Sequence, residues 1–266
     1  MTTRGWDRVP EGDTVYLTAQ NLRRALAGQV LTRCDIRVPA FATVDLTGET
    51  VREVVSRGKH LLIRIGEATI HSHLKMEGSW HLYLPGSRWR RPDWQARIIL
   101  STADWVAVGF QLGLLEVVPT KDEAAAVGHL GPDPLGPDWD ADEALKRMLA
   151  DPARPIGLAL LDQRVIAGLG NVYRNEVCFL RGVLPTRPVG EVPEPRKLIE
   201  LAQRLIHANR ERTPRTTTGQ LRGETAWVHG REGKPCLRCG TTIRQGTLGE
   251  DALQQRNTFY CPVCQN

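Results

Sequence analysis

The sequence lacks any long apolar run and is poor in aromatic side chains, which make up 6% of its 266 residues. Its longest apolar stretch, Ile156–Leu161, contains a glycine and is far shorter than the roughly 20 residues that cross a bilayer. Residues 1–8 are polar and have no apolar core, so the start of the chain does not resemble a secretory signal. These absences argue against a membrane protein and against a secreted one.

Lysine is also scarce, because only six of the 35 basic residues are lysine and the others are arginine. Arginine suits forked contacts to phosphate, although a GC-rich genome would give the same bias. The formal net charge of +5 favours a polyanionic partner and is equally compatible with an ordinary basic enzyme. With 41% hydrophobic and 24% charged residues, the chain is expected to be globular rather than fibrous or disordered, and its length suggests two domains.

Four of the six cysteines lie close together near the end of the chain, as two Cys-x-x-Cys pairs. The pairs are Cys236 with Cys239 and Cys261 with Cys264. Two such pairs separated by a hairpin-length insert are typical of a tetrahedral thiolate site for zinc. The alternative is two disulfides, which the absence of a secretory signal disfavours.

The first zone of the chain, to about residue 120, has the short alternating or β-branched runs of strands. A helix precedes them, with Asp13 or Thr14 as its cap and Gly28 as its end. This zone is therefore expected to be a β-sandwich or barrel with a leading helix. The expected strands are 51–56, 60–65, 69–74, 97–100 and 105–108.

A linker rich in glycine and proline, 131–137, leads into a helical zone. The threonine-rich stretch 213–225 is expected to be an exposed mobile loop that precedes the cysteine module. Helices are expected from Asp140 or Asp142 to Leu149, from Pro155 to about Ile166, from an Asn171 cap to about Gly182, and from Pro195 onward.

Segment 162–171 joins two of these helices through a turn that contains two glycines and ends at Asn171. Free backbone N–H groups at the start of the next helix, together with the Asn171 amide and the helix dipole, suit a phosphate group. Contacts of this kind position DNA without reading its sequence. The feature is weak alone, because many helical hairpins contain a Gly-x-Gly-Asn run.

The same region closely resembles the helix–two-turn–helix signature of the formamidopyrimidine-DNA glycosylase and endonuclease VIII family. Other segments resemble that family's catalytic N-terminus, lysine turn, intercalation segment, interdomain linker and zinc finger, in the right order. Together they cover nearly the whole chain from residue 10. The segments are Pro10–Thr14, Gly58–Leu61, His73–Gly78, Leu130–Leu135, Leu161–Val177, Val228–Cys236 and Arg256–Cys261.

The resemblance implies an α+β multidomain fold. It has an N-terminal β-sandwich with a leading helix over 10–130, a helix–two-turn–helix domain over 131–228 and a zinc-finger β-hairpin over 229–266. It also implies a bifunctional DNA glycosylase and abasic-site lyase of base excision repair, expected to be a monomer in the bacterial cytoplasm. The partner would be double-stranded DNA with a damaged base or an abasic site, and the cofactor one structural Zn²⁺. The damaged base must leave the stack before it can be attacked.

The resemblance assigns catalytic roles to Pro10, Glu11, Lys59 and Arg256. The amine of an N-terminal proline would attack the sugar C1′ and form an iminium cation, which drives elimination of the 3′ phosphate. Glu11 would transfer protons at the sugar or the leaving base, and Lys59 would contact phosphate and assist these transfers. Arg256 would grip phosphates beside the lesion. Without the resemblance, Glu11 would be interpreted only as a negative charge that stabilises the start of a helix. Lys59 would be interpreted as a solvated residue of a turn.

Residues that touch the DNA duplex are implied in the same way. Asn171 would contact phosphate, and Met76 would fill the gap left by the flipped base, although alone it would be interpreted as core packing. The formamidopyrimidine branch usually has Arg-Arg-Phe-Gly where this chain has Phe110–Gly113. Gln111 or Leu112 would therefore act as the second wedge, and the arginine contact opposite the lesion is put in question.

The lesion class is suggested by Gly12, which follows the Pro-Glu pair and favours the endonuclease VIII branch, whose members remove oxidised pyrimidines. The alternatives are a glycosylase for formamidopyrimidine and 8-oxoguanine, and a catalytically silent protein that binds damaged DNA.

Pro10 poses a chemical problem because it follows Val9, so its nitrogen is a tertiary amide that cannot attack C1′. A GUG codon encodes valine inside a gene but starts many bacterial proteins as methionine. We therefore expect the native enzyme to begin at Pro10, with residues 1–9 as an extension that is not native.

Overall fold

The computed structural model describes residues 10–266, and the described chain divides into two compact units. The first unit comprises Pro10 and residues 14–129, and the second comprises residues 11–13 and 130–266. The expected extension 1–9 lies outside the described residues. No described helix is both long and apolar enough to cross a membrane.

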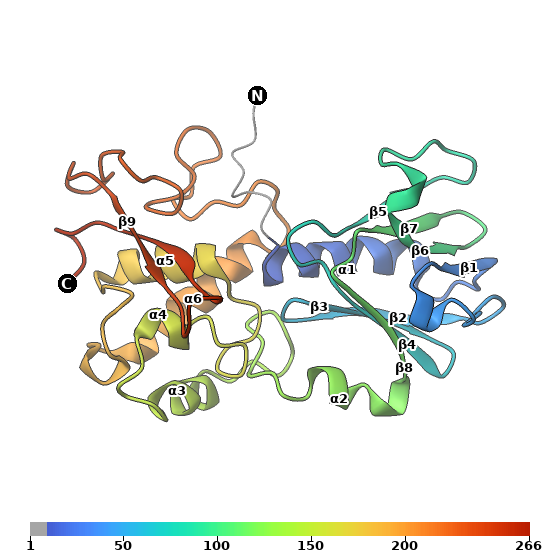
Figure 1. Cartoon of the computed structure of the whole chain (residues 1–266), viewed down its shortest axis with the longest axis horizontal. Helices are drawn as coiled ribbons and strands as arrows, with labels where there is room; N and C mark the ends of the chain where they lie inside the picture. The colour runs from blue at the N-terminus through green and yellow to red at the C-terminus, as the bar shows by residue number, and fades with distance from the viewer. Residues whose placement is uncertain (1–9) are drawn as a thin grey trace. The chain divides into compact units, whose positions relative to one another are not determined.

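The first unit is a β-sandwich that follows the leading helix α1, Gly12–Leu26 (Figure 1). Every strand pair in its two sheets is antiparallel. One sheet has the order β1-β6-β7-β5, with bounds Arg33–Ile36, Ala96–Ser101, Val106–Phe110 and Ser79–Tyr83. The other has the order β2-β3-β4-β8, with bounds Val51–Arg57, His60–Ile65, Ala68–His73 and Leu114–Pro119. The expected β-sandwich with a leading helix is confirmed.

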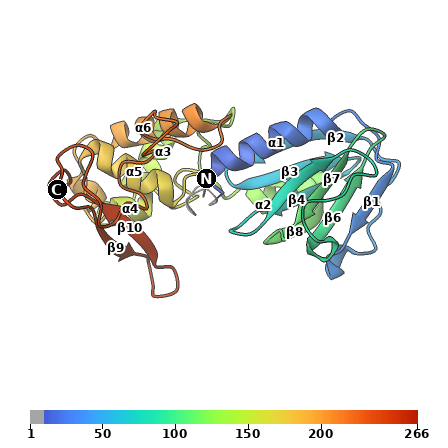
Figure 2. The ribbon, with the colours of Figure 1, turned by 90° about the horizontal axis from the view of Figure 1, so that it is seen from above.

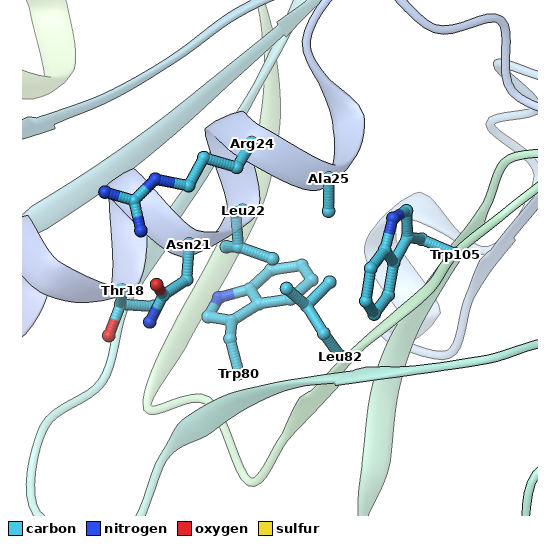
Figure 3. A pocket seen from close by; sticks show the side chains of 8 residues that line it. All are labelled: Thr18, Asn21, Leu22, Arg24, Ala25, Trp80, Leu82 and Trp105. Atoms are coloured by element: carbon cyan, nitrogen blue, oxygen red, sulfur yellow. The ribbon is translucent and has the colours of Figure 1, made fainter.

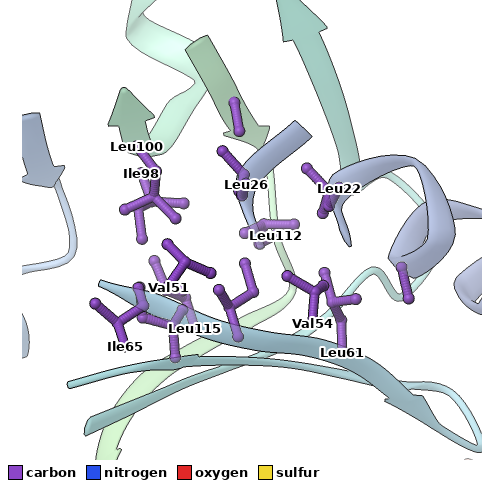
Figure 4. Packing of buried hydrophobic residues seen from close by; sticks show 14 of the residues in the cluster. Leu22, Leu26, Val51, Val54, Leu61, Ile65, Ile98, Leu100, Leu112 and Leu115 are labelled. Atoms are coloured by element: carbon purple, nitrogen blue, oxygen red, sulfur yellow. The ribbon is translucent and has the colours of Figure 1, made fainter. Parts of the chain in front are cut away.

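The core of this unit lies where α1 and the two sheets meet. Figure 2 shows α1 lying along the sandwich. Leu22 and Leu26 of α1 pack in one buried cluster with Ile98 and Leu100 of one sheet and Val51 of the other (Figure 4). Alternation along each strand places these apolar residues on the inner faces, and their removal from water is the main force that holds the layers together.

The expected strands correspond to β2, β3, β4, β6 and β7, while β1, β5 and β8 were not expected. The short edge strand Arg33–Ile36 is mostly polar, and Ser79–Tyr83 is half-buried at four of its five positions, so neither has the apolar alternation of a strand. The expected cap of the first helix is wrong. The helix begins at Gly12, and Asp13 lies inside its first turn.

The second unit contains helices α3 Ala141–Leu149, α4 Ile156–Ala159, α5 Asn171–Arg181 and α6 Pro195–Asn209. A two-stranded hairpin, β9 Arg244–Leu248 and β10 Arg256–Tyr260, completes it. Asp140 caps α3, as expected, because its side chain accepts the N–H groups of Asp142 and Glu143.

One expectation about the helical zone is wrong. The helix from Pro155 ends at Ala159, because Asp162 accepts the N–H of Arg164 and the Gln163 amide donates to two nearby carbonyls. These side chains compete with the helical hydrogen bonds. The expected linker 131–137 contains no helix or strand, although its first four residues are buried and Gly131 N donates to Gln163 O.

The threonine-rich stretch is not wholly an exposed loop, because Arg215, Thr216 and Thr217 are buried. Arg215 pairs with Asp13, Thr216 N donates to Asn209 Oδ1, and the Thr217 hydroxyl donates to Glu176. Hydrogen bonds and an ion pair within the second unit therefore keep these three residues buried, although the composition of the segment indicated an exposed loop.

Candidate functional site

Glu11 is fully buried in the second unit, and its carboxylate lies at the N-terminal end of α5. Oε2 accepts the N–H of Gly170 at 2.8 Å, and Oε1 accepts the N–H of Val172 at 2.8 Å. These are two of the N–H groups that a helix start leaves without partners, and the helix dipole favours a negative charge there. Glu11 therefore caps the N-terminus of α5, and its role is not limited to a favourable charge at the start of α1.

The glycines of the turn make this contact possible. A Cβ on Gly170 would lie 2.5 Å from Glu11 Cδ, so a side chain at 170 would displace the carboxylate. Gly12 N donates to Gly168 O at 2.9 Å, and a Cβ on Gly12 would lie 3.0 Å from Gly168 Cα. The Gly-x-Gly-Asn run thus brings segment 11–12 and the start of α5 into backbone contact.

Asp13 belongs to a buried network that the sequence did not suggest. Its Oδ2 accepts the N–H of Arg215 Nε at 2.6 Å and the hydroxyl of Tyr173 at 2.7 Å. Burial acts to lower the pKa of Arg215, but the carboxylates of Asp13 and Glu11 outweigh it and raise that pKa. Burial, and then the charge of Asp13, raises the pKa of the Tyr173 hydroxyl well above its ordinary value. Arg215 and Asp13 therefore remain an ion pair that fixes the start of α1 in the second unit.

Helix α5 also holds the hairpin β9–β10 beside it (Figure 1). Asn171 Nδ2 donates to Asn257 O at 2.9 Å, and Arg174 Nη2 donates to the same oxygen at 2.8 Å. Arg256, the first residue of β10, is exposed. Burial, together with the charge of Arg256, lowers the pKa of Arg174 to about 10. The amide of Asn171 is thus a structural link as well as a candidate phosphate contact.

Glu176 fixes the segment that leads into the cysteine module. Its carboxylate accepts the N–H groups of Trp227, Val228 and His229 at 2.8–2.9 Å. Sequence reasoning missed this residue. The only signal was its position on the helix that begins at Asn171, which places it inside the unit beside the hairpin.

Cys236, Cys239, Cys261 and Cys264 come together as the sequence predicted. Their sulfur atoms all lie within 4.8 Å of one another, and none of these cysteines forms a disulfide. The Cys236 and Cys264 sulfurs are 3.9 Å apart, and the Cys239 and Cys261 sulfurs are 3.5 Å apart. The group could hold a metal ion.

Lys59 lies in the first unit, in the turn between β2 and β3. The next residue, His60, begins a chain of hydrogen bonds across three strands: its Nδ1 is 2.7 Å from His71 Nε2, and His71 Nδ1 is 2.7 Å from Glu116 Oε1. Burial, and then the neighbouring His71 and His73, lower the pKa of His60 to about 3. Burial, and then Lys75 and Lys59, lower the pKa of His73 to about 4. The imidazoles of His60 and His73, near Lys59, are therefore neutral at neutral pH.

The candidate wedge residues differ in exposure. Met76 is 58% exposed, in the turn between β4 and β5, whereas Leu112 is 8% exposed and belongs to the core cluster. Gln111 is half-buried, with a left-handed φ of 46°. The structure thus presents Met76 and Gln111 at the surface of the first unit, while it packs Leu112 inside. The wedge roles stay predictions.

The first unit also contains a hollow of about 360 Å³, which none of the predicted site residues lines (Figure 3). Its wall combines indole and leucine side chains with the polar side of α1. The lining residues are Thr18, Asn21, Leu22, Arg24, Ala25, Trp80, Leu82 and Trp105. The predicted residues instead fall into two groups. Pro10, Lys59, Met76, Gln111 and Leu112 belong to the first unit, and Glu11, Asn171, Arg256 and the four cysteines belong to the second.

Comparison with known proteins agrees with these features. Residues 9–111 match the formamidopyrimidine-DNA glycosylase N-terminal domain, and residues 130–209 match the formamidopyrimidine-DNA glycosylase H2TH domain. A probable endonuclease 8 2 of Streptomyces coelicolor is 56% identical over 261 residues, which cover 97% of this chain and 94% of that protein. The DNA-(apurinic or apyrimidinic site) lyase Nei2 of Mycolicibacterium smegmatis is 54% identical over 258 residues, covering 97% and 99%.

The solved structures give the same fold. The complex of Lactococcus lactis Fpg with DNA that contains an abasic site matches with a TM-score of 0.80 and 25% identity, covering 96% of this chain and 99% of that one. The chain therefore belongs to the formamidopyrimidine-DNA glycosylase and endonuclease VIII family, in its endonuclease VIII branch.

Proposed function

We propose that this protein is a bifunctional DNA glycosylase and abasic-site lyase of base excision repair, which excises oxidised pyrimidines from duplex DNA. The observation that carries the proposal is the position of Glu11. It directly follows Pro10 in the chain, and two backbone N–H groups at the start of α5 hold its carboxylate. A buried and oriented carboxylate beside a proline nitrogen is the pair that amine-based glycosylase chemistry needs.

The reaction begins when the free secondary amine of Pro10 attacks C1′ of the damaged nucleotide. An α-amino group has a pKa of about 7.7–8.0, so a useful fraction is neutral at cellular pH. The C1′–base bond breaks and the base leaves with a proton, while the nitrogen loses its own proton. The C1′–O4′ bond of the sugar ring then opens as O4′ takes up a proton, and the C1′–nitrogen bond becomes an iminium. The iminium takes up the electron pair left when C2′ loses a proton, and this expels the 3′ phosphate. A second elimination releases the 5′ phosphate.

The other residues supply proton transfers and hold the DNA. Glu11 carries protons at the sugar ring and the leaving base. Lys59 contacts phosphate and assists proton transfers near the sugar. Arg256 and Asn171 grip the phosphates beside the lesion, and Met76 fills the space left by the flipped nucleotide.

We infer that the four cysteines hold one structural zinc ion. Sulfur atoms that bind zinc tetrahedrally at about 2.3 Å lie about 3.8 Å apart, and the separations of 3.5 and 3.9 Å within two of the sulfur pairs fit this geometry. Four thiolates close the coordination shell, so the metal holds the hairpin that bears Arg256 and takes no part at the lesion. Metal analysis of protein purified without chelator should find one zinc per chain, and its absence would contradict this proposal.

We propose further that the enzyme acts as a monomer in the bacterial cytoplasm, where its substrate is double-stranded DNA with a damaged base or an abasic site. The bacterial relatives support the setting.

The proposed chemistry is tested by trapping with borohydride. A form that begins at Pro10, mixed with a lesion duplex and borohydride, should give a covalent protein–DNA complex, because borohydride reduces the iminium to a stable amine. Pro10→Gly should reduce the yield. A protein that binds the duplex yet never forms the complex would be a silent damage-binding protein.

The lesion class is tested by comparing duplexes that carry 5-hydroxycytosine with duplexes that carry 8-oxoguanine. Faster single-turnover excision of the oxidised cytosine is expected. Faster excision of 8-oxoguanine would move the protein to the purine-directed alternative.

A further inference from the structure

Two strained turns lie side by side at one edge of the first unit. Lys75 and Gln111 have φ values of 54° and 46°, and they are two of only three non-glycine residues with positive φ in the part of the chain that the structure describes. Such conformations cost free energy and cluster at functional sites. Gly113 N donates to His73 O at 3.1 Å, and a Cβ on Gly113 would lie 2.2 Å from Lys75 Cγ. The turn with Met76 and the turn with Gln111 are therefore in direct contact.

Arg91, from the loop between β5 and β6, bridges these two turns. Its Nη1 donates to Gln111 Oε1 at 2.8 Å and reaches Glu77 O at 3.4 Å. The loop itself is anchored, because the Trp89 ring packs against Phe110 and Arg90 N donates to the Tyr83 hydroxyl. Gln111 N also donates to Gln95 O at 2.9 Å. The loop between β5 and β6, for which the sequence indicated no role, thus contacts the two turns that carry the candidate wedge residues Met76 and Gln111.

The bridge leaves most of the guanidinium available. Within described residues 10–266, Arg91 forms no ion pair, and only its Nη1 is hydrogen bonded. The side chain is half-buried, and no described residue accepts a hydrogen bond from Nε or Nη2. The charges of Arg91 and Arg90 act on a nearby imidazole as well, since burial and then these two arginines lower the pKa of His81.

The bridge also fixes which end of the Gln111 amide faces outward. Because Arg91 donates to Oε1, that oxygen is occupied and the Nε2 group, which has two N–H donors, points away from the arginine. The Gln111 Nε2 group and the remaining N–H groups of Arg91 therefore present hydrogen-bond donors. Donors match the N7 and O6 acceptors of guanine, the base opposite an oxidised cytosine.

We propose that Arg91 positions the Met76 and Gln111 turns and, together with Gln111, binds the base that loses its partner when the damaged nucleotide flips out. This rests on the proposed function. The chain lacks an arginine in segment 110–113, and Arg91 supplies a guanidinium there from another loop. Arg91 should therefore contribute to base excision only when the opposite DNA strand is present.

The test measures single-turnover excision of 5-hydroxycytosine from a duplex and from the same strand alone, using a protein that begins at Pro10. Arg91→Ala should slow excision from the duplex about tenfold, the factor that a charge-assisted hydrogen bond carries, and should change excision from the single strand less than about twofold. Arg90→Ala is the matched control, because the Arg90 side chain forms no hydrogen bond or ion pair with the described residues of either turn, and it should behave like the parent protein.

A second variant separates positioning from folding. Gln111→Gly removes the amide while glycine tolerates the positive φ, so it should slow the duplex reaction in the same way. Combined with Arg91→Ala it should add little, because both changes remove one shared contact.

The inference is overturned if Arg91→Ala matches Arg90→Ala on the duplex, or if it slows both substrates equally together with a lower melting temperature. If the parent protein excises no base from either substrate, the proposed function itself is wrong.

Discussion

Glycine at position 170 is the residue on which the placement of Glu11 depends. The carboxylate occupies the space that a Cβ at 170 would need, only 2.5 Å from Glu11 Cδ. From sequence alone, the Pro-Glu pair and the Gly-x-Gly-Asn run are separate motifs about 160 residues apart, and neither shows that one caps the other. In the structure these two motifs lie in contact, and the start of α5 holds the Glu11 carboxylate in a fixed orientation.

This dependence gives a prediction for Gly170→Ala. The added methyl should displace Glu11 and slow base excision by at least about 100-fold, the lower range for loss of a general acid–base group. Overpacking should also lower the free energy of unfolding by about 1–3 kcal/mol. Gly246→Ala is a suitable control, because the nearest atom to its Cβ is 3.8 Å away. Wild-type excision rates in Gly170→Ala, measured in single turnovers, would contradict the role assigned to Glu11.

Arg256 is an exposed charge on a hairpin that α5 and the cysteine group hold in place. Arg256→Ala should weaken binding to damaged and undamaged duplexes by similar factors, because a phosphate contact carries no sequence information. The slope of log K against log salt should fall by about 0.9 for one lost phosphate contact. Titrations at several salt concentrations measure this slope. An unchanged slope would argue against the contact.

Asn171→Ala provides the comparison for that experiment. It should weaken binding to both duplexes, because the amide also ties α5 to Asn257 of the hairpin. Since the side chain is neutral, the salt slope should stay nearly unchanged.

At the scale of elements, hydrogen bonds across β3, β4 and β8 connect His60 and His71 to Glu116. The pKa of His60 is lowered to about 3 and that of His73 to about 4, mainly by burial. In the unfolded chain these imidazoles take up protons near their ordinary pKa of about 6.5. The unfolded state therefore binds more protons below that pH, and stability must fall as the pH decreases from about 6.5 toward 4.

We expect the melting temperature to follow this trend, and His60→Phe to flatten it by removing one of the groups that stays neutral in the folded state. Melting curves between pH 4 and 8 would measure both. A slope that His60→Phe leaves unchanged would show that the acid sensitivity arises elsewhere.

Some of the helices and strands could be predicted from the sequence, and others could not. Helices α3, α5 and α6 and five strands were predictable, because caps, prolines and apolar alternation are local signals. Strands such as Ser79–Tyr83 were not, since their pairing partners lie far along the chain and supply the reason for an extended backbone. The cysteine cluster was predictable from spacing. Partners such as Arg215 for Asp13 and Arg91 for Gln111 were not, because long-range packing alone brings them together.

At the scale of the whole molecule, the proposed reaction needs residues from both units. Pro10 and Lys59 belong to one unit, and Glu11 and Arg256 belong to the other. The division between the units therefore falls between Pro10 and Glu11, which are neighbours in the chain. Residues 11–13 are fixed to the second unit by Gly168, Gly170 and Arg215, and from Thr14 onward α1 belongs to the sandwich. In the proposed mechanism, the reaction depends on the short segment around Pro10, where the chain passes from one unit to the other.

The last prediction follows from the bond that joins Val9 to Pro10. In a peptide bond the proline nitrogen shares its lone pair with the preceding carbonyl, so it is not a nucleophile. We propose that the active form begins at Pro10, because only a free amine there can attack C1′. The 266-residue form should bind lesion duplexes but form almost no borohydride-trapped complex, whereas the form that begins at Pro10 should form it readily. Mass spectrometry must show that the long form stays intact during the assay. If the intact long form cleaves lesions as fast as the short one, the nucleophile is another amine, and Lys59→Ala is the first variant to examine.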